Sequence, residues 1–150
     1  MKHLGVLLTF FFGIGVYSPL TGQNVDMWSK LSKVTFKTSF NPELMMETSV
    51  VSLSESVEDL NGEIIEIEGF IIPLSGQVSQ SHFMFSRFPQ STCFFCGKAG
   101  PESAMQVFMK NGKKVKITER KVKVQGRLLI NPKDANSLLY SLDNATILEI

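Results

Sequence analysis

Residues 63–74, EIIEIEGFIIPL, constrain the fold of this chain more than any other segment. Charged and apolar residues trade places over residues 63–68, which is the two-residue period of a strand with one buried face. Gly69 interrupts the run without ending it, as expected where a strand bulges or bends, and Pro73 ends the ladder because it has no N–H to donate. A long strand that bends at a glycine can serve two sheets, so this segment favours a small closed barrel.

Further strand patterns follow this segment. Asn111-Gly112 is the usual signal of a two-residue hairpin turn, because both residues tolerate positive φ, and it predicts that residues 109–110 pair with residues 113–118. Asn131-Pro132 is typical of a helix start, with Leu138, Leu139 and Leu142 on the helix that follows. The other strands are expected at residues 82–85, 104–109, 121–129 and 145–150.

The segment before the barrel pattern is shorter and more mixed. Asp26 can cap a short helix over residues 26–33, and residues 34–40 alternate loosely as a strand. A helical turn is expected after Ser54. The predicted organisation is therefore a signal peptide (1–22), an N-terminal extension with a short helix and a strand (23–56), and a mainly β domain (57–150). We expect that domain to be a small closed or partly open OB-like barrel with short helices; an open α+β sandwich is the alternative.

The first twenty-two residues have the layout of a secretory signal peptide. Lys2 supplies a positive charge, residues 4–17 are uncharged and almost wholly apolar, and residues 18–22 bring in small and turn-forming residues. The apolar run is shorter than the roughly 20 residues that a membrane-spanning helix needs. We therefore expect cleavage near Gly22 and a soluble periplasmic chain with no membrane span; an uncleaved anchor is the alternative.

Charge narrows the classes of partner. Loss of Lys2 with the signal would leave fourteen basic and fourteen acidic residues. A net charge near zero indicates neither a nucleic-acid partner nor an anionic membrane surface, since both are bound by excess positive charge.

Cys93 and Cys96, within Cys-Phe-Phe-Cys-Gly, are the only cysteines of the chain. Two thiols at this spacing can close a disulfide, exchange electrons or bind a soft metal. Gly97 stands where haem attachment of the c type requires a histidine. A thioredoxin-like site needs a helix start after the first cysteine within a βαβ pattern, whereas this region is rich in strands and glycine.

A metal site would need ligands from outside this motif. His82 is the only histidine after the predicted signal, and Glu102 follows Cys96 by six residues. Cys93, Cys96 and His82, with Glu102 or a water molecule, would make a four-coordinate site, and thiolate ligands favour zinc or Cu(I). The alternative is a structural Cys93–Cys96 disulfide that pins the glycine-rich loop, because an exported chain folds in an oxidising compartment.

Three segments carry a family resemblance: residues 69–74 (GFIIPL), the cysteine motif, and residues 123–128 (KVQGRL). Together they resemble a family of exported OB-like domains of unknown function from Gram-negative bacteria, in which a G-[FY]-[IVM]-[IV]-P-L strand precedes a G-A-C-x-H loop. Cys93 matches the family cysteine, while Phe95 stands at the family histidine and Cys96 follows it. Residues 93–103 look like a distinct branch of that family. Some members lie beside genes of zinc-regulated transport systems, so the resemblance implies export, an OB-like fold and a link to transport.

The function expected from the sequence is that of an exported, non-enzymatic binding or accessory domain. Its cysteine motif would bind zinc or another soft metal, and its partner would be an envelope transporter or another exported protein. A protein-interaction module with a structural disulfide is the first alternative, and a thiol-disulfide oxidoreductase is the second.

Overall fold

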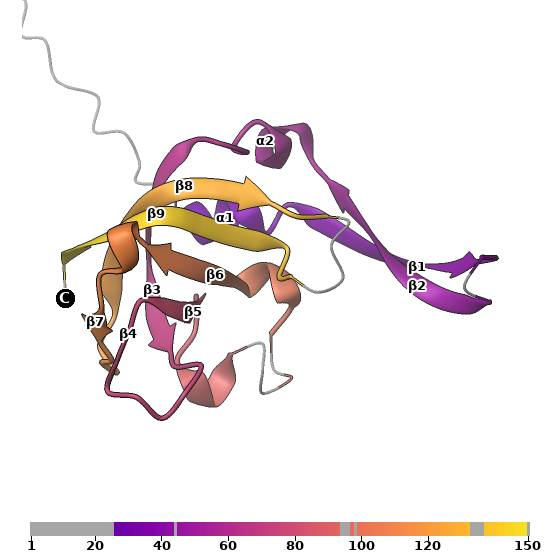
Figure 1. Cartoon of the computed structure of the whole chain (residues 1–150). Coiled ribbons are helices and arrows are strands. Elements are labelled where there is room, and N and C mark those ends of the chain that lie inside the picture. Colours follow the sequence, from indigo (N-terminus) through magenta and orange to yellow (C-terminus); the bar gives the residue numbers. More distant parts are fainter. Residues whose placement is uncertain (1–25, 44, 94–96, 98, 133–136, 150) are drawn as a thin grey trace, which may run out of the picture.

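The protein is seen in a computed structural model that describes residues 26–43, 45–93, 97, 99–132 and 137–149. The predicted signal peptide (1–22) and Cys96 lie outside the described residues. Figure 1 shows two parts: a barrel, and a two-stranded arm that projects from it. In the part of the chain described, no helix has the length and apolar character needed to cross a membrane.

Five strands close the barrel in the order β3-β5-β6-β9-β8. Neighbouring strands are antiparallel except β6 and β9, which are parallel. The first barrel strand thus lies between the second and the fourth, and the third lies beside the fifth, which is the OB arrangement. The prediction of a mainly β, OB-like barrel is confirmed. The strands are β3 (Ile64–Ile72), β5 (His82–Ser86), β6 (Ala104–Met109), β8 (Val122–Ile130) and β9 (Tyr140–Glu149).

Gly69 is the point at which β3 changes partner. Residues 64–69 of β3 pair with β8, and residues 70–72 pair with β5. The glycine is needed for space: a Cβ there would lie 2.5 Å from the Ser86 carbonyl oxygen and 2.9 Å from Cε1 of Phe85. The predicted bend at Gly69 is therefore present, and it lets one strand join two sides of the barrel.

A short helix before the barrel strands belongs to the barrel core. In α1 (Met27–Leu31), Trp28 and Leu31 are buried within the main hydrophobic cluster, as is Val57 of α2 (Glu55–Glu58). Trp28 Nε1 donates to the Glu68 carbonyl oxygen at 2.7 Å, and the Tyr140 hydroxyl donates to the Leu31 carbonyl oxygen at 2.7 Å. These bonds join the predicted extension to both the first and the last barrel strand.

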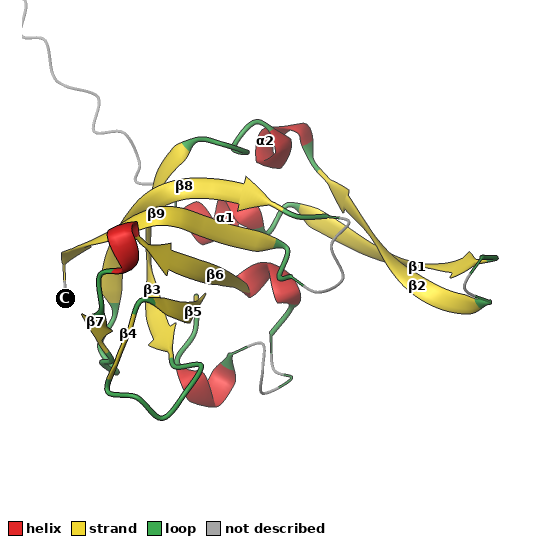
Figure 2. Cartoon of the chain, viewed as in Figure 1, coloured by secondary structure: helices red, strands yellow, loops and turns green. Residues whose placement is uncertain are grey.

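The arm is an antiparallel hairpin of β1 (Val34–Asn41) and β2 (Met46–Leu53). Figure 2 shows β1 running outward from the barrel and β2 returning to it. The strand at residues 34–40 was predicted. β2 was not, because the sequence METSVVSL alternates only weakly between apolar and polar residues.

Two local predictions were wrong. Asn111 and Gly112 do have positive φ, at 54° and 65°, but they lie in the 3₁₀ turn η4 (Lys110–Gly112), and β7 (Val115–Lys116) pairs with β4 (Ser79–Gln80) instead of with β6. The leucines placed on a helix are not helical either: Leu142 lies within β9, where burial between β6 and β8 outweighs its helical spacing. Residues 133–136 lie outside the described residues.

Candidate functional site

The segment between β5 and β6, residues 87–103, carries the cysteine motif and is called the cysteine loop below. Its two ends are joined, since the Arg87 N–H donates to the Ser103 carbonyl oxygen at 2.9 Å. Ser103 also folds the loop back on itself, its hydroxyl donating to the Gly100 carbonyl oxygen at 2.6 Å. Two 3₁₀ turns, η1 (Gln90–Thr92) and η3 (Pro101–Ser103), shape the rest of the described loop.

Cys93 is buried in this loop. Its side chain is wholly inaccessible to solvent, and its Sγ donates to the Gln90 carbonyl oxygen at 3.2 Å. Cys93, which directly follows η1, therefore stabilises this turn through its buried side chain and through this hydrogen bond. A thiol in this position is out of reach of a substrate that approaches from solvent.

The other predicted ligands lie at different parts of the fold. His82 is exposed at the start of β5, with its ring stacked on Phe108 at 4.2 Å between centroids. The cysteine loop begins after Ser86, at the other end of the same strand, roughly 13 Å along it at about 3.3 Å per residue. Across the described ranges, no three histidine, cysteine, aspartate or glutamate side chains gather in a way that could bind a metal ion. The metal set of Cys93, Cys96, His82 and Glu102 stays a prediction, and Cys96 lies outside these ranges.

Glu102 belongs to a different environment, close to α1. Its carboxylate lies against Gly100, and it lines a small cleft of about 250 Å³ that also includes Trp28 and Arg87. Burial, and to a lesser extent the charge of Glu102, raises the pKa of the Tyr140 phenol well above its usual range. Tyr140 is therefore kept protonated as a hydrogen-bond donor to α1.

A larger cleft of about 770 Å³ lies beside the cysteine loop. One wall is the end of β3, a second is the start of η1, and the third is the segment that follows β7. Apolar side chains dominate it, and Lys121 adds a cation beside it, with Nζ 6.0 Å from the centre of the Phe70 ring. The lining residues are Phe70, Ile71, Ile72, Pro73, Pro89, Gln90, Ser91, Ile117, Thr118 and Glu119.

A second cleft, of about 460 Å³, is charged. Its lining includes Asp26 and Arg87, which form an ion pair at 2.9 Å, and Lys123 and Glu68, which form another at 3.3 Å. The charges there are thus largely matched within the protein. The apolar cleft beside η1 is the better candidate for a binding site, because its lining is mainly apolar with a few polar groups.

The sequence patterns did not indicate this apolar cleft. Its three walls come from segments more than 15 residues apart, and only their packing in the barrel brings them together. The one sequence signal near it was Pro73 directly after the bent strand. Comparisons with protein-family models, curated proteins and solved structures gave no match. The resemblance to exported OB-like domains therefore stays a prediction.

Proposed function

We propose that this chain is an exported, non-enzymatic binding module whose binding site is the apolar cleft beside η1. The observation that carries this proposal is the construction of the cleft. The barrel strand β3 supplies one fixed wall, and the cysteine loop supplies another whose first turn rests on the buried Cys93. An apolar concavity of this size is the usual form of a site for an apolar ligand.

The chemistry of the lining suggests the kind of ligand. Phe70, Ile72 and Ile117 offer apolar surface, while Gln90 and Thr118 offer polar groups that can orient what binds. An extended apolar segment of another exported protein, such as a component of an envelope transporter, fits this combination. The partner would insert one or two apolar side chains and hydrogen-bond at the rim.

In this proposal the cysteines are structural. Complete burial of Cys93 supports the interaction module with a pinned loop over the thiol oxidoreductase, which needs an accessible thiolate. Zinc binding by the loop requires Cys96 and further ligands. Thiol titration with zinc analysis tests it directly: two free thiols and about one zinc per chain support a metal site, whereas neither free thiols nor zinc supports a disulfide.

The cleft can be tested with an apolar fluorescent probe, anilinonaphthalene sulfonate, whose fluorescence rises in apolar surroundings. We expect saturable binding to the native chain, with a loss of about tenfold in affinity in Ser91→Trp, which fills the cleft from η1. Ser56→Trp is the matched control, because Ser56 is exposed on α2 and lines none of the described clefts. Equal binding by both variants would assign the probe to another surface and remove the support for this site.

A further inference from the structure

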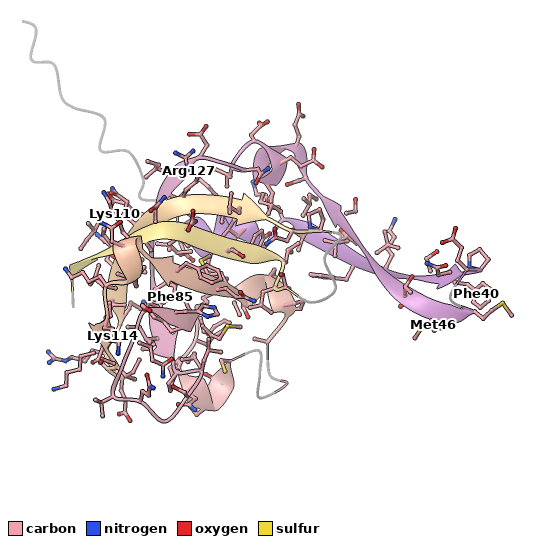
Figure 3. The ribbon with its side chains drawn as sticks, viewed as in Figure 1. Phe40, Met46, Phe85, Lys110, Lys114 and Arg127 are labelled. Carbon is pink, nitrogen blue, oxygen red and sulfur yellow. The ribbon has the colours of Figure 1, made fainter. Side chains whose placement is uncertain are left out.

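One face of the β1–β2 arm carries apolar side chains from the barrel outward, with the polar Thr38 and Glu47 among them. Near the barrel, Val34, Val51 and Leu53 on this face pack against the core. Further out on the same face, Phe36 is 37% exposed and Phe40 is 58% exposed. Figure 3 shows Phe40 at the outer end of the arm, far from Phe85 in the barrel. A two-stranded ribbon is at best marginally stable in water when nothing covers it.

The outer edge of β1 carries a set of backbone groups that β2 does not use. The Ser54 N–H donates to the Lys33 carbonyl oxygen, so residues 33 and 54 form a hydrogen-bonded pair at the base of the hairpin. Such pairs alternate along an antiparallel ladder, and the register aligns Val34 with Leu53. The N–H and C=O groups of Phe36, Thr38 and Phe40 therefore point outward, away from β2. They are arranged to accept another strand.

We propose that the occupant is β1 of a second copy of this chain, paired antiparallel about a two-fold axis at Thr38. In this register Thr38 lies opposite its own copy, and Phe36 lies opposite Phe40 of the other arm. The outward groups of the two strands then meet as hydrogen-bonded pairs, and the four phenylalanines share one face. The result is a four-stranded sheet, β2-β1-β1-β2, which is wide enough to support an apolar face.

The distribution of charge favours antiparallel pairing about Thr38 over the neighbouring registers and over parallel pairing. Moving the axis to Lys37 would place two lysines directly opposite each other, which is destabilising. The arm carries Glu43 and Glu47 at its tip and Lys33 and Lys37 toward its base, and all four are exposed. Antiparallel pairing brings the acidic tip of one arm to the basic part of the other, whereas parallel pairing would join like charges.

Sedimentation of the purified chain over a range of concentrations tests the proposal, with a doubling of mass expected. Thr38→Pro should abolish the dimer, because it removes an N–H that only the second copy uses. Ser49→Pro is the matched control, since the alternation places its N–H on the outer edge of β2, and it should leave the dimer intact. A wild-type chain that is monomeric throughout, or a dimer that survives Thr38→Pro, would overturn the proposal, as would loss of the dimer in Ser49→Pro alone.

Cross-linking covers the case in which a proline variant does not fold. Hydrogen-bonded antiparallel partners have Cα atoms about 5.5 Å apart, within the range of a disulfide. Thr38→Cys should therefore form an oxidised dimer, beyond any formed by the native cysteines. Ser39→Cys should not, because its copies are diagonal at about 7–8 Å. Equal cross-linking of the two variants contradicts the register. Flotation of a monomeric chain with phosphatidylglycerol vesicles, lost in Phe40→Ser, would assign the arm to a lipid surface instead.

Discussion

Replacement of Gly69 by alanine should be among the most damaging single-methyl changes in the barrel. The added Cβ would lie 2.5 Å from the Ser86 carbonyl oxygen, against an ordinary contact of 3.4 Å or more, so β3 and β5 would have to separate by about 0.9 Å. This is the point at which β3 leaves β8 and joins β5. The Phe85 ring, with Cε1 at 2.9 Å, also obstructs the methyl group and is itself fully buried.

The loss in free energy of unfolding caused by Gly69→Ala can be estimated from these close contacts. Overpacking a filled core costs about 1–3 kcal/mol, and contact with backbone on one side and a buried ring on the other places Gly69→Ala near 3 kcal/mol. With a urea dependence of about 1.5 kcal/mol per molar, the unfolding midpoint should fall by roughly 2 M. Equilibrium unfolding followed by Trp28 fluorescence measures this, because Trp28 is buried in the core and is the only tryptophan.

Gly76→Ala is the matched control. Gly76 lies between β3 and β4, its φ is not positive, and a Cβ there meets nothing within 4 Å. We expect no loss of stability, or a gain of up to about 1 kcal/mol through a less flexible unfolded chain. If Gly69→Ala costs less than about 0.5 kcal/mol relative to Gly76→Ala, the close approach of β3 to β5 is not what requires glycine.

Two further predictions concern Tyr140. Tyr140→Phe should lower the free energy of unfolding by about 1–2 kcal/mol in urea titrations, because the Leu31 carbonyl loses its 2.7 Å donor; an unchanged midpoint would mean that the bond contributes nothing net. The pKa of Tyr140 is raised on folding from its usual 10.0, so its contribution to stability is complete below pH 10 and is lost as the unfolded chain ionises above it. The wild type should lose about 1.4 kcal/mol per pH unit more than Tyr140→Phe above pH 10, and parallel curves would contradict this.

The barrel was predictable because its strands carry their own signals. Alternation over residues 63–68, with Gly69 in the middle of the run, indicated a bent strand, and the structure places the change of partner at that glycine. The alternating run over residues 121–129 likewise became β8. In both strands the order of apolar residues alone shows which face is buried, so a local pattern is enough to predict the strand.

The errors arose where pairing depends on distant segments. β2 carries serine, threonine and glutamate among its apolar residues, and it is defined by its register with β1. The short strand β7 pairs with β4, some 35 residues earlier, and not with β6, the strand that precedes it in the sequence. Leu142 has helical spacing from Leu138, yet it fills the barrel core between β6 and β8.

The candidate site was predictable only in part. The motif indicated correctly that Cys93 lies in a loop after β5, but residue spacing could not show that its thiol is buried against Gln90. His82 was included among the ligands because it is the only histidine after the predicted signal. An extended strand carries His82 away from the loop, because each residue of β5 adds about 3.3 Å.

The hydrogen bond between Tyr140 and Leu31 has a consequence for how the chain folds. It joins residues 109 positions apart, and β9 fills the last gap in the barrel, between β6 and β8. Helix α1 is synthesised early, but the surface against which it packs is incomplete until β9 has been synthesised. Folding must therefore wait for long-range closure, which makes it slow compared with that of a helical domain of similar size. Until β9 is in place, the side chains of Trp28 and Leu31 form apolar surface to which a chaperone can bind.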